Sequence, residues 1–298
     1  EGNAVSGSEF DFVIVGSGSA GSIMAARLSE DPSVRVALLE FGGSDRSTFV
    51  QMPTALSIPM TKDQFNWGYW SDPEPGLDGR VMDCPRGKVL GGSSSINGMA
   101  YVRGCAGDLN QWEEAGAEGW NYASLLPYYR RMETTAWGDD AYRGREGAVG
   151  VGNGNDRQMN PLYDAFIQAG EQAGYPVTED YNGHQQEGFS PMQMNVAGGV
   201  RQSTANAYLA PARKRSNLTI ITGVMAQRVL LDGTTYNLSD VPVLPALGNH
   251  DTWPYFAAGG EAAGALAELA SLYGEALVPS ERQSLAERGY YVHKLAEG

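Results

Sequence analysis

The sequence predicts an α/β fold that begins with a parallel βαβ unit. Two short apolar runs, residues 10–15 and 34–39, have the composition of buried strands. Between them lie Ile23, Ala26 and Leu28, which are compatible with a helix packed closely on a sheet. The two strands are expected to be parallel, because a helical crossover of this length offers no other short route.

The rest of the chain divides into segments of different character. Residues 41–87 contain prolines at short intervals and predict a long excursion over the surface. Residues 107–132 and 161–173 predict helices, the second of which ends at Gly174. Residues 218–231 are rich in strand-forming residues around one glycine.

A hairpin-type turn at Asp232-Gly233 calls for a second strand that pairs back. Residues 234–240 lead instead into residues 241–247, whose two prolines disfavour a central strand. Residues 261–273 then predict a weak, alanine-rich helix. We therefore predict that the strand expected to follow the turn and pair back with the preceding strand is missing.

The composition excludes several classes of protein. Of the 298 residues 42% are apolar and 10% aromatic, which is enough for a sizeable core. The net charge of −14 makes nucleic acid and anionic membranes poor partners. We find no integral membrane segment and no signal-peptide pattern. Cys84 and Cys105 lack metal or redox spacing, so we expect two free thiols and a cytoplasmic location.

A glycine-rich motif lies between the first predicted strand and helix. Gly16 permits the tight turn, Gly18 lets a pyrophosphate approach the backbone, and Gly21 lets the helix pack closely on the strand. The helix N-terminus then offers free amides and partial positive charge to the anion. Glu40 follows the second strand and is placed to accept hydrogen bonds from ribose hydroxyls. This motif predicts a Rossmann-like dinucleotide site but does not distinguish nicotinamide from flavin.

A second glycine- and serine-rich segment spans residues 86–104. Gly91, Gly92 and residues 93–95 are expected to expose amides and hydroxyls without bulky side chains. Such a loop suits a phosphate and a polyhydroxylated linker.

This second segment resembles the first signature of the glucose-methanol-choline (GMC) family of FAD-dependent alcohol oxidoreductases. The agreement extends to residues 39–43, 66–69, 201–209 and 217–219, and it covers residues 10–233 in all. The resemblance implies a doubly wound FAD-binding domain and part of a substrate domain built on an antiparallel sheet, both incomplete in this chain.

The implied domain boundaries are 1–150 for the N-terminal part of the FAD-binding domain, 151–215 for part of the substrate domain, 216–233 for strands that return to the FAD domain, and 234–298 for a tail foreign to the family.

The resemblance also implies which residues hold FAD. Gly16, Gly18 and Gly21 hold the pyrophosphate, Glu40 the adenosine ribose, and the backbone of Val224 the adenine. The ribityl chain and the isoalloxazine edge are lined by Gly91, Gly92, Ser93, Asn97, Gly98, Met99 and Ala100. Some family members bind the flavin covalently through a histidine at the position of Ile96, so we expect non-covalent FAD here.

The family's chemistry moves a hydride from an alcohol carbon to flavin N5, while a histidine near the C-terminus takes the hydroxyl proton. The resemblance implies that the substrate is a small primary or secondary alcohol, choline-like or aliphatic. This chain has His184, His250 and His293, and none lies in a matching motif. We therefore assign no catalytic residue and expect little or no alcohol oxidation from this chain.

The segment 241–293 has a resemblance of its own, to the Gly-Asn-His block of calcineurin-like metallophosphoesterases of the acid sphingomyelinase-like branch. In that family Asn249 would bind a metal and His250 a phosphate. The other ligand blocks do not occur in the sequence, so no working metal site is expected.

Three functions stay open at this point. The first is FAD-dependent alcohol oxidation, the second is metal-dependent phosphodiester hydrolysis by a fragment, and the third is nucleotide binding without catalysis. The sequence leaves the oligomeric state undetermined.

Overall fold

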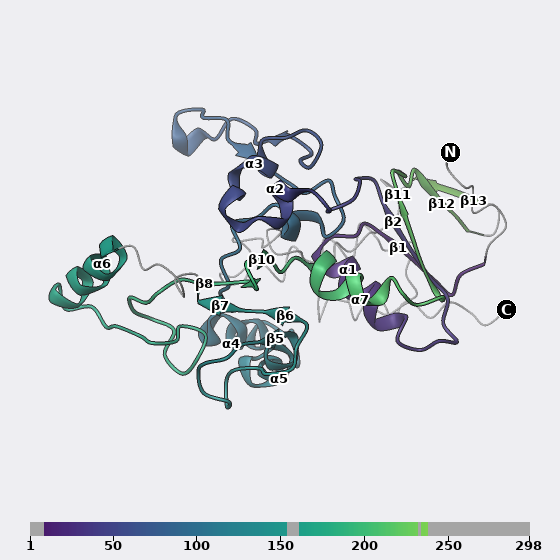
Figure 1. Cartoon of the computed structure of the whole chain (residues 1–298). Helices are drawn as coiled ribbons and strands as arrows, with labels where there is room; N and C mark the ends of the chain where they lie inside the picture. The colour runs from purple at the N-terminus through teal and green to yellow at the C-terminus, as the bar shows by residue number, and fades with distance from the viewer. Residues whose placement is uncertain (1–8, 154–160, 232–233, 238–298) are drawn as a thin grey trace.

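The computed structural model describes residues 9–153, 161–231 and 234–237. Its central layer is a parallel sheet in which β2 (Val36–Glu40) lies between β1 (Phe12–Val15) and β11 (Leu218–Thr222) (Figure 1). Helix α1 (Ser19–Leu28) connects β1 to β2, which confirms the predicted βαβ unit. The apolar run of β2 is buried, as expected for the central strand of a parallel sheet.

Helix α1 packs on β1 and β2 through small residues. Ala25 and Ala26 are buried, and their short side chains let the helix axis approach the strands closely. The π-helical turn η4 (Ala205–Leu209) packs on α1 and continues into α7 (Ala210–Ala212). The largest apolar cluster therefore forms where the sheet, α1 and η4 meet.

The excursion predicted for residues 41–87 is built from short elements: α2 (Thr48–Gln51), η1 (Pro53–Ala55), α3 (Ser57–Met60), β3 (Tyr69–Trp70), η2 (Pro75–Leu77) and β4 (Asp83–Cys84). Strands β3 and β4 pair antiparallel. A second apolar cluster of Val50, Phe65, Val89 and Ile96 anchors the excursion to the loop that follows it. That loop contains the 3-10 turn η3 (Gly92–Ser95).

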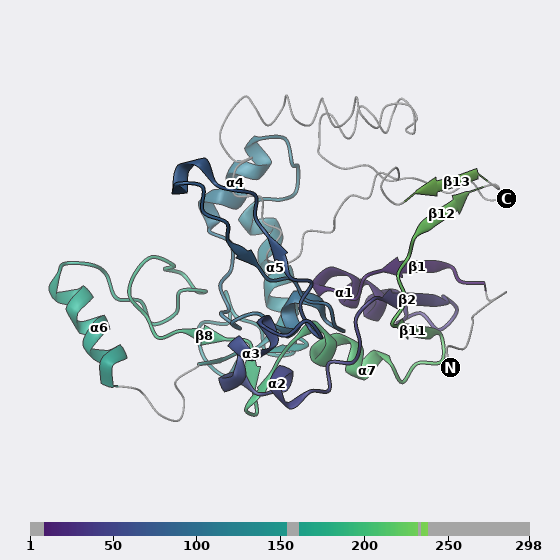
Figure 2. The same cartoon turned by 90° about the horizontal axis from the view of Figure 1, so that it is seen from above.

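The predicted helix over residues 107–132 is two helices, α4 (Ala106–Glu114) and α5 (Tyr122–Met132). Asn121 begins α5, because its side chain accepts a hydrogen bond from the amide of Ser124 at 2.8 Å. Helix α6 (Pro161–Gln172) agrees with its prediction to within a residue at its end. Both views place α6 at the end of the molecule remote from the parallel sheet (Figures 1 and 2).

The part matching the substrate domain contains two-stranded pieces of sheet. Strand β7 (Gly152–Asn153) pairs antiparallel with β8 (Gln193–Met194), and β9 (Val196–Ala197) pairs antiparallel with β10 (Val200–Arg201). Just before this part of the chain, strands β5 (Glu133–Thr134) and β6 (Val149–Gly150) run parallel.

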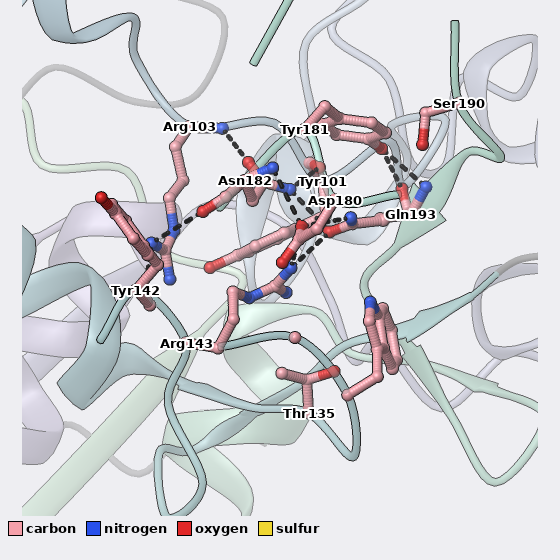
Figure 3. A network of polar contacts seen from close by, with 12 residues as sticks. Tyr101, Arg103, Thr135, Tyr142, Arg143, Asp180, Tyr181, Asn182, Ser190 and Gln193 are labelled. Carbon is pink, nitrogen blue, oxygen red and sulfur yellow. Dashed lines mark hydrogen bonds and ion pairs between the residues drawn. The ribbon is translucent and has the colours of Figure 1, made fainter. Parts of the chain in front are cut away.

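A buried ionic network joins this part to residues assigned to the FAD-binding domain. The carboxylate of Glu133 accepts from Arg103 and from Arg143, each at 2.8 Å. Arg143 also binds Asp180 at 2.6 Å and the side-chain oxygen of Gln193 at 2.9 Å (Figure 3). Two arginines are thus balanced by two carboxylates away from water.

One expectation from the sequence is wrong. Strand β12 (Arg228–Leu231) does have a pairing partner, the antiparallel strand β13 (Thr234–Asn237), with Leu231 opposite Thr234. The prolines at 242 and 245 lie beyond this pair, and the threonines and tyrosine before them favour a strand. The predicted helix 261–273 lies outside the described residues.

Within the described ranges no helix is long and apolar enough to cross a membrane. Cys84 and Cys105 are free thiols.

Candidate functional site

The first glycine-rich turn leaves the start of α1 open. Gly16 has a φ of 90°, which a residue with a side chain rarely adopts, and its amide donates to the carbonyl of Leu39 at 2.8 Å. No side chain caps the N-terminus of α1, and a Cβ added at Gly18 would meet no atom within 4 Å. The free amides of the first helical turn therefore face space that an anion such as a pyrophosphate can fill.

Gly21 has a different role from Gly18. A Cβ on Gly21 would lie 2.0 Å from the carbonyl oxygen of Gly16 and 3.2 Å from a methyl carbon of Ile14. The glycine is therefore needed for the close packing of α1 on the turn and on β1.

Glu40 ties the first turn to the end of β2. The residue is 6% exposed, and its Oε2 accepts from the amide and the hydroxyl of Ser17 at 2.8 and 2.7 Å. Its Oε1 accepts from the amide of Gly42 at 2.7 Å. Since a carboxylate oxygen can accept two hydrogen bonds, Oε1 retains one lone pair for a ribose hydroxyl.

The two glycine-rich segments that the sequence singles out are in contact. The amide of Gly91 donates to the carbonyl of Ser17 at 2.9 Å. A Cβ on Gly92 would lie 2.6 Å from the Cα of Gly18. A ligand held at the first turn therefore also meets the second loop.

The hydroxyls of two of the three serines in the second loop serve the protein rather than a ligand. Ser94 and Ser95 are buried and donate to the carbonyls of Gly91 and Leu90, each at 2.6 Å. The expectation that these two hydroxyls are exposed is wrong, because the tight loop buries carbonyls that need donors. Ser93 is half-buried, and its hydroxyl accepts from the amide of Gly87 at 3.1 Å.

The segment after the loop presents backbone rather than side chains. Met99 has a φ of 61° and a fully buried side chain, and its amide donates to Asn97 Oδ1 at 3.1 Å. Gly98 and Ala100 are exposed, and a Cβ on Gly98 would meet nothing within 4 Å. Ile96 lies in an apolar cluster and offers no nucleophile for a covalent bond.

Val224 lies beside Glu40 at the same edge of the sheet. Its amide donates to the carbonyl of Glu40 at 3.1 Å, while its own carbonyl accepts no hydrogen bond from the described part of the chain. The free carbonyl can accept from an amino group such as that of adenine.

These residues together fit a dinucleotide such as FAD. An open helix N-terminus, two glycine loops in contact and an acid with a spare lone pair lie at the carboxyl end of a parallel sheet, where such ligands bind in doubly wound folds.

The described histidine lies elsewhere. His184 is exposed, and its Nδ1 lies 3.2 Å from the hydroxyl of Tyr142. It lines a pocket with Arg103 and Tyr181 that includes none of the predicted cofactor residues. His250, His293 and Asn249 lie outside the described residues. Among the residues that the structure describes, no cluster of three His, Cys, Asp or Glu side chains could hold a metal ion.

Two residues that hold the candidate site together carry no role in the sequence analysis. Ser17 joins Glu40 to Gly91, although only the glycines of its motif carry an assigned role. Arg201 belongs to a segment that carries the family resemblance, and it contacts the second loop at Asn97. The family resemblance of that segment was the sequence signal that could have pointed to Arg201.

The model of the family described as GMC oxidoreductase matches residues 10–252. The oxygen-dependent choline dehydrogenase of Photobacterium profundum is 60% identical over 222 residues, which are 74% of this chain and 39% of the relative. The protein of the same name from Vibrio vulnificus is 59% identical over 223 residues, 75% of this chain and 40% of the relative.

Solved structures share the fold. Pyridoxine 4-oxidase from Mesorbium loti matches with a TM-score of 0.69 and 33% identity, over 76% of this chain and 47% of that one. A formate oxidase from Aspergillus oryzae RIB40, in a study of its FAD modification, matches with a TM-score of 0.68 and 26% identity, over 80% of this chain and 44% of that one.

The family match also bears on the tail. It continues to residue 252 and so includes Asn249 and His250, which the sequence reasoning placed in a foreign segment. Neither the family match nor the two choline dehydrogenases give the phosphoesterase interpretation of residues 241–293 any support.

Proposed function

Because the chain belongs to the GMC oxidoreductase family, we propose that it is the FAD-holding part of an alcohol oxidoreductase of the choline dehydrogenase type. The chain spans about two fifths of the length of the curated relatives it matches. The observation that carries the proposal is the contact between the two glycine-rich loops beside the uncapped N-terminus of α1.

The residues of this chain bind and orient the cofactor. The amides of Gly18 and of the first turn of α1 would hold the pyrophosphate, with the tight turn at Gly16 placing them and the dipole of α1 behind them, while Glu40 would accept from the ribose and Val224 from the adenine. The residues along the ribityl chain and the flavin edge are Gly91, Gly92, Ser93, Asn97, Gly98, Met99 and Ala100, and Gly21 positions α1. When bound, FAD supplies the acceptance of a hydride from the alcohol carbon. The cofactor is non-covalent, because Ile96 has no group that could bond to it.

The proposed substrate is a small alcohol, and choline is the first to test, since the relatives from Photobacterium profundum and Vibrio vulnificus are choline dehydrogenases. A cytoplasmic location is part of the proposal and rests on the two free thiols. The part of the chain that the structure describes brings no histidine to the cofactor loops, so the base that takes the hydroxyl proton is left unassigned.

Titration of FAD into the purified 298-residue chain tests the proposal. We expect saturable quenching of flavin fluorescence, and we expect denaturation with trichloroacetic acid to release all of the flavin into the supernatant. Absence of saturable binding would overturn the proposed function, and flavin that stays with the precipitated protein would overturn its non-covalent attachment.

A further inference from the structure

Arg201 is a buried cation held by oxygen atoms of uncharged groups. It is fully buried at the end of β10, and its Nε donates to the carbonyl of Val50 at 2.8 Å. Its Nη1 donates to the carbonyl of Ser94 at 3.3 Å, and to the carbonyl and Oδ1 of Asn97 at 2.7 and 3.0 Å. Its Nη2 is buried without a partner in the described part of the chain.

The charge of Arg201 is not balanced within the described part of the chain, where no carboxylate forms an ion pair with it. Arg143 shows the contrast. Burial pulls the pKa of Arg143 down, but the carboxylates of Glu133 and Asp180 outweigh it and raise the pKa above its ordinary value. Burial alone lowers the pKa of Arg201 to about 10, so its guanidinium is still charged at neutral pH.

A buried charge without a counter-charge is costly, which makes Arg201 a candidate for a group that acts on a ligand. The acceptors of Arg201 lie on the loop that carries Asn97, one of the residues assigned to the flavin edge. Asn97 Oδ1 is shared between Arg201 and the amide of Met99, which fixes the orientation of its amide group. The unbalanced cation therefore lies behind the loop on which the cofactor is proposed to rest.

We propose that Arg201 is a positioning residue whose unbalanced positive charge stabilises the negative charge that a flavin gains on reduction. Transfer of a hydride, which is two electrons and one proton, onto an uncharged flavin leaves one negative charge there. The hydroxyl proton of the alcohol leaves separately to a base. A cation behind the loop thus favours the reduced state and raises the reduction potential. This inference rests on the proposed function.

The test is the midpoint potential of FAD bound to the 298-residue chain, measured against a redox dye. Arg201→Met removes the charge and keeps much of the volume, while Arg201→Lys keeps the charge. Arg35→Met is the matched control, since it removes the charge of an exposed arginine at the amino end of β2, whereas the proposed cofactor residues lie at the carboxyl end. In Arg201→Met we expect the preference for reduced over oxidised FAD to fall about tenfold, which is about 30 mV for a two-electron couple.

We expect Arg201→Lys and Arg35→Met to keep the parent potential. A purely structural role predicts a different result, in which Arg201→Met weakens binding of both redox states equally and leaves the potential unchanged. That result would overturn the inference. If Arg201→Met does not fold, the midpoint potentials of Arg201→Gln and Arg201→Lys are compared instead. Equal potentials in these two variants would also overturn the inference. A parent chain that binds no FAD would instead refute the proposed function, which the titration detects separately.

Discussion

Gly92 and Gly18 lie so close that a Cβ on Gly92 would sit 2.6 Å from the Cα of Gly18. The two residues belong to loops that are far apart in the sequence. Their contact joins a turn that begins a helix to a loop that follows the long surface excursion. Variants at this contact can therefore separate the loss of a cofactor site from the loss of the fold.

The two glycines of the first motif should respond differently to alanine. In Gly18→Ala the new methyl group meets no atom within 4 Å, so we expect the free energy of unfolding without FAD to change by less than about 1 kcal/mol. FAD affinity should fall about tenfold or more, because the methyl group occupies the space of the pyrophosphate. FAD titration and urea unfolding of both proteins measure the two quantities.

Gly21→Ala is the matched counterpart. Its Cβ would lie 2.0 Å from the carbonyl oxygen of Gly16, so we expect a loss of about 1–3 kcal/mol in the free energy of unfolding without FAD. Equal stability of Gly18→Ala and Gly21→Ala would contradict the packing role assigned to Gly21.

Removal of the Glu40 carboxylate should have two measurable effects. In Glu40→Ala the amides of Ser17 and Gly42 lose their acceptor, and we expect unfolding to become easier by about 1–3 kcal/mol. FAD binding should weaken by about 1–3 kcal/mol as well, the scale of a lost hydrogen bond to a charged group. Glu30→Ala, which breaks an exposed ion pair with Arg27, is the control and should change neither quantity by more than about 1 kcal/mol. Unchanged FAD affinity in Glu40→Ala would refute the ribose contact.

The ionic network should fail when its shared carboxylate is neutralised. Glu133→Gln leaves Arg103 and Arg143 with only Asp180 as counter-charge, and we expect a loss of about 3–5 kcal/mol in stability. Asp140→Asn removes the carboxylate of a surface ion pair with Arg145 and should cost at most about 1 kcal/mol. Chemical unfolding of both variants measures the two losses in the free energy of unfolding. Equal losses would show that the buried network stabilises the protein no more than a surface ion pair does.

Tyr101 should make the protein sensitive to alkali. Burial and then the charge of Glu133 raise the pKa of Tyr101 above its ordinary value. The folded pKa is the higher one, so its contribution to stability is present below about pH 10 and falls as the pH rises further. At about pH 11, Tyr101→Phe should therefore retain about 1.4 kcal/mol of stability that the parent loses.

At neutral pH the same variant should cost little, because the Tyr101 hydroxyl makes no hydrogen bond in the described structure. Tyr128→Phe is the control, since the side chain of Tyr128 is exposed. Parallel pH profiles of the parent and Tyr101→Phe would disprove the assignment.

Turnover by the 298-residue chain should be weak or absent. Loss of a positioned base alone costs about 10²–10⁴-fold in rate, and the described residues place no histidine at the cofactor loops. Anaerobic mixing of the FAD-loaded chain with choline, benzyl alcohol or ethanol, followed by flavin absorbance, measures this. Rapid bleaching that His184→Ala abolishes would show that His184 is the base after all.

The βαβ unit and the positions of Gly16 and Gly18 could be predicted because they depend on local patterns of apolar residues and glycines. The role of Ser17 could not, since its partners Glu40 and Gly91 are brought to it by the sheet and by the packing of the second loop. The burial of Ser95 was missed for a different reason, because its hydroxyl donates to the carbonyl of Leu90 within the same tight loop. Composition suggests an exposed polar loop, and the left-handed backbone of the loop decides otherwise.

The resemblance of residues 201–209 to the family could have pointed to Arg201, but its contacts could not be predicted, because they join segments far apart in the chain. Strand β13 could have been predicted, because the short threonine-rich run before the prolines favours a strand and is sufficient for pairing with β12.

Among the residues that the structure describes, strand β1 is an edge of the three-stranded sheet, and Phe12, Val13 and Val15 are each about half exposed along it. An edge strand with free backbone groups and apolar side chains is a template for another strand from any chain that approaches it. The solubility of this polypeptide therefore depends on what covers β1. If β1 is left uncovered, aggregation should rise with protein concentration and begin at this edge strand.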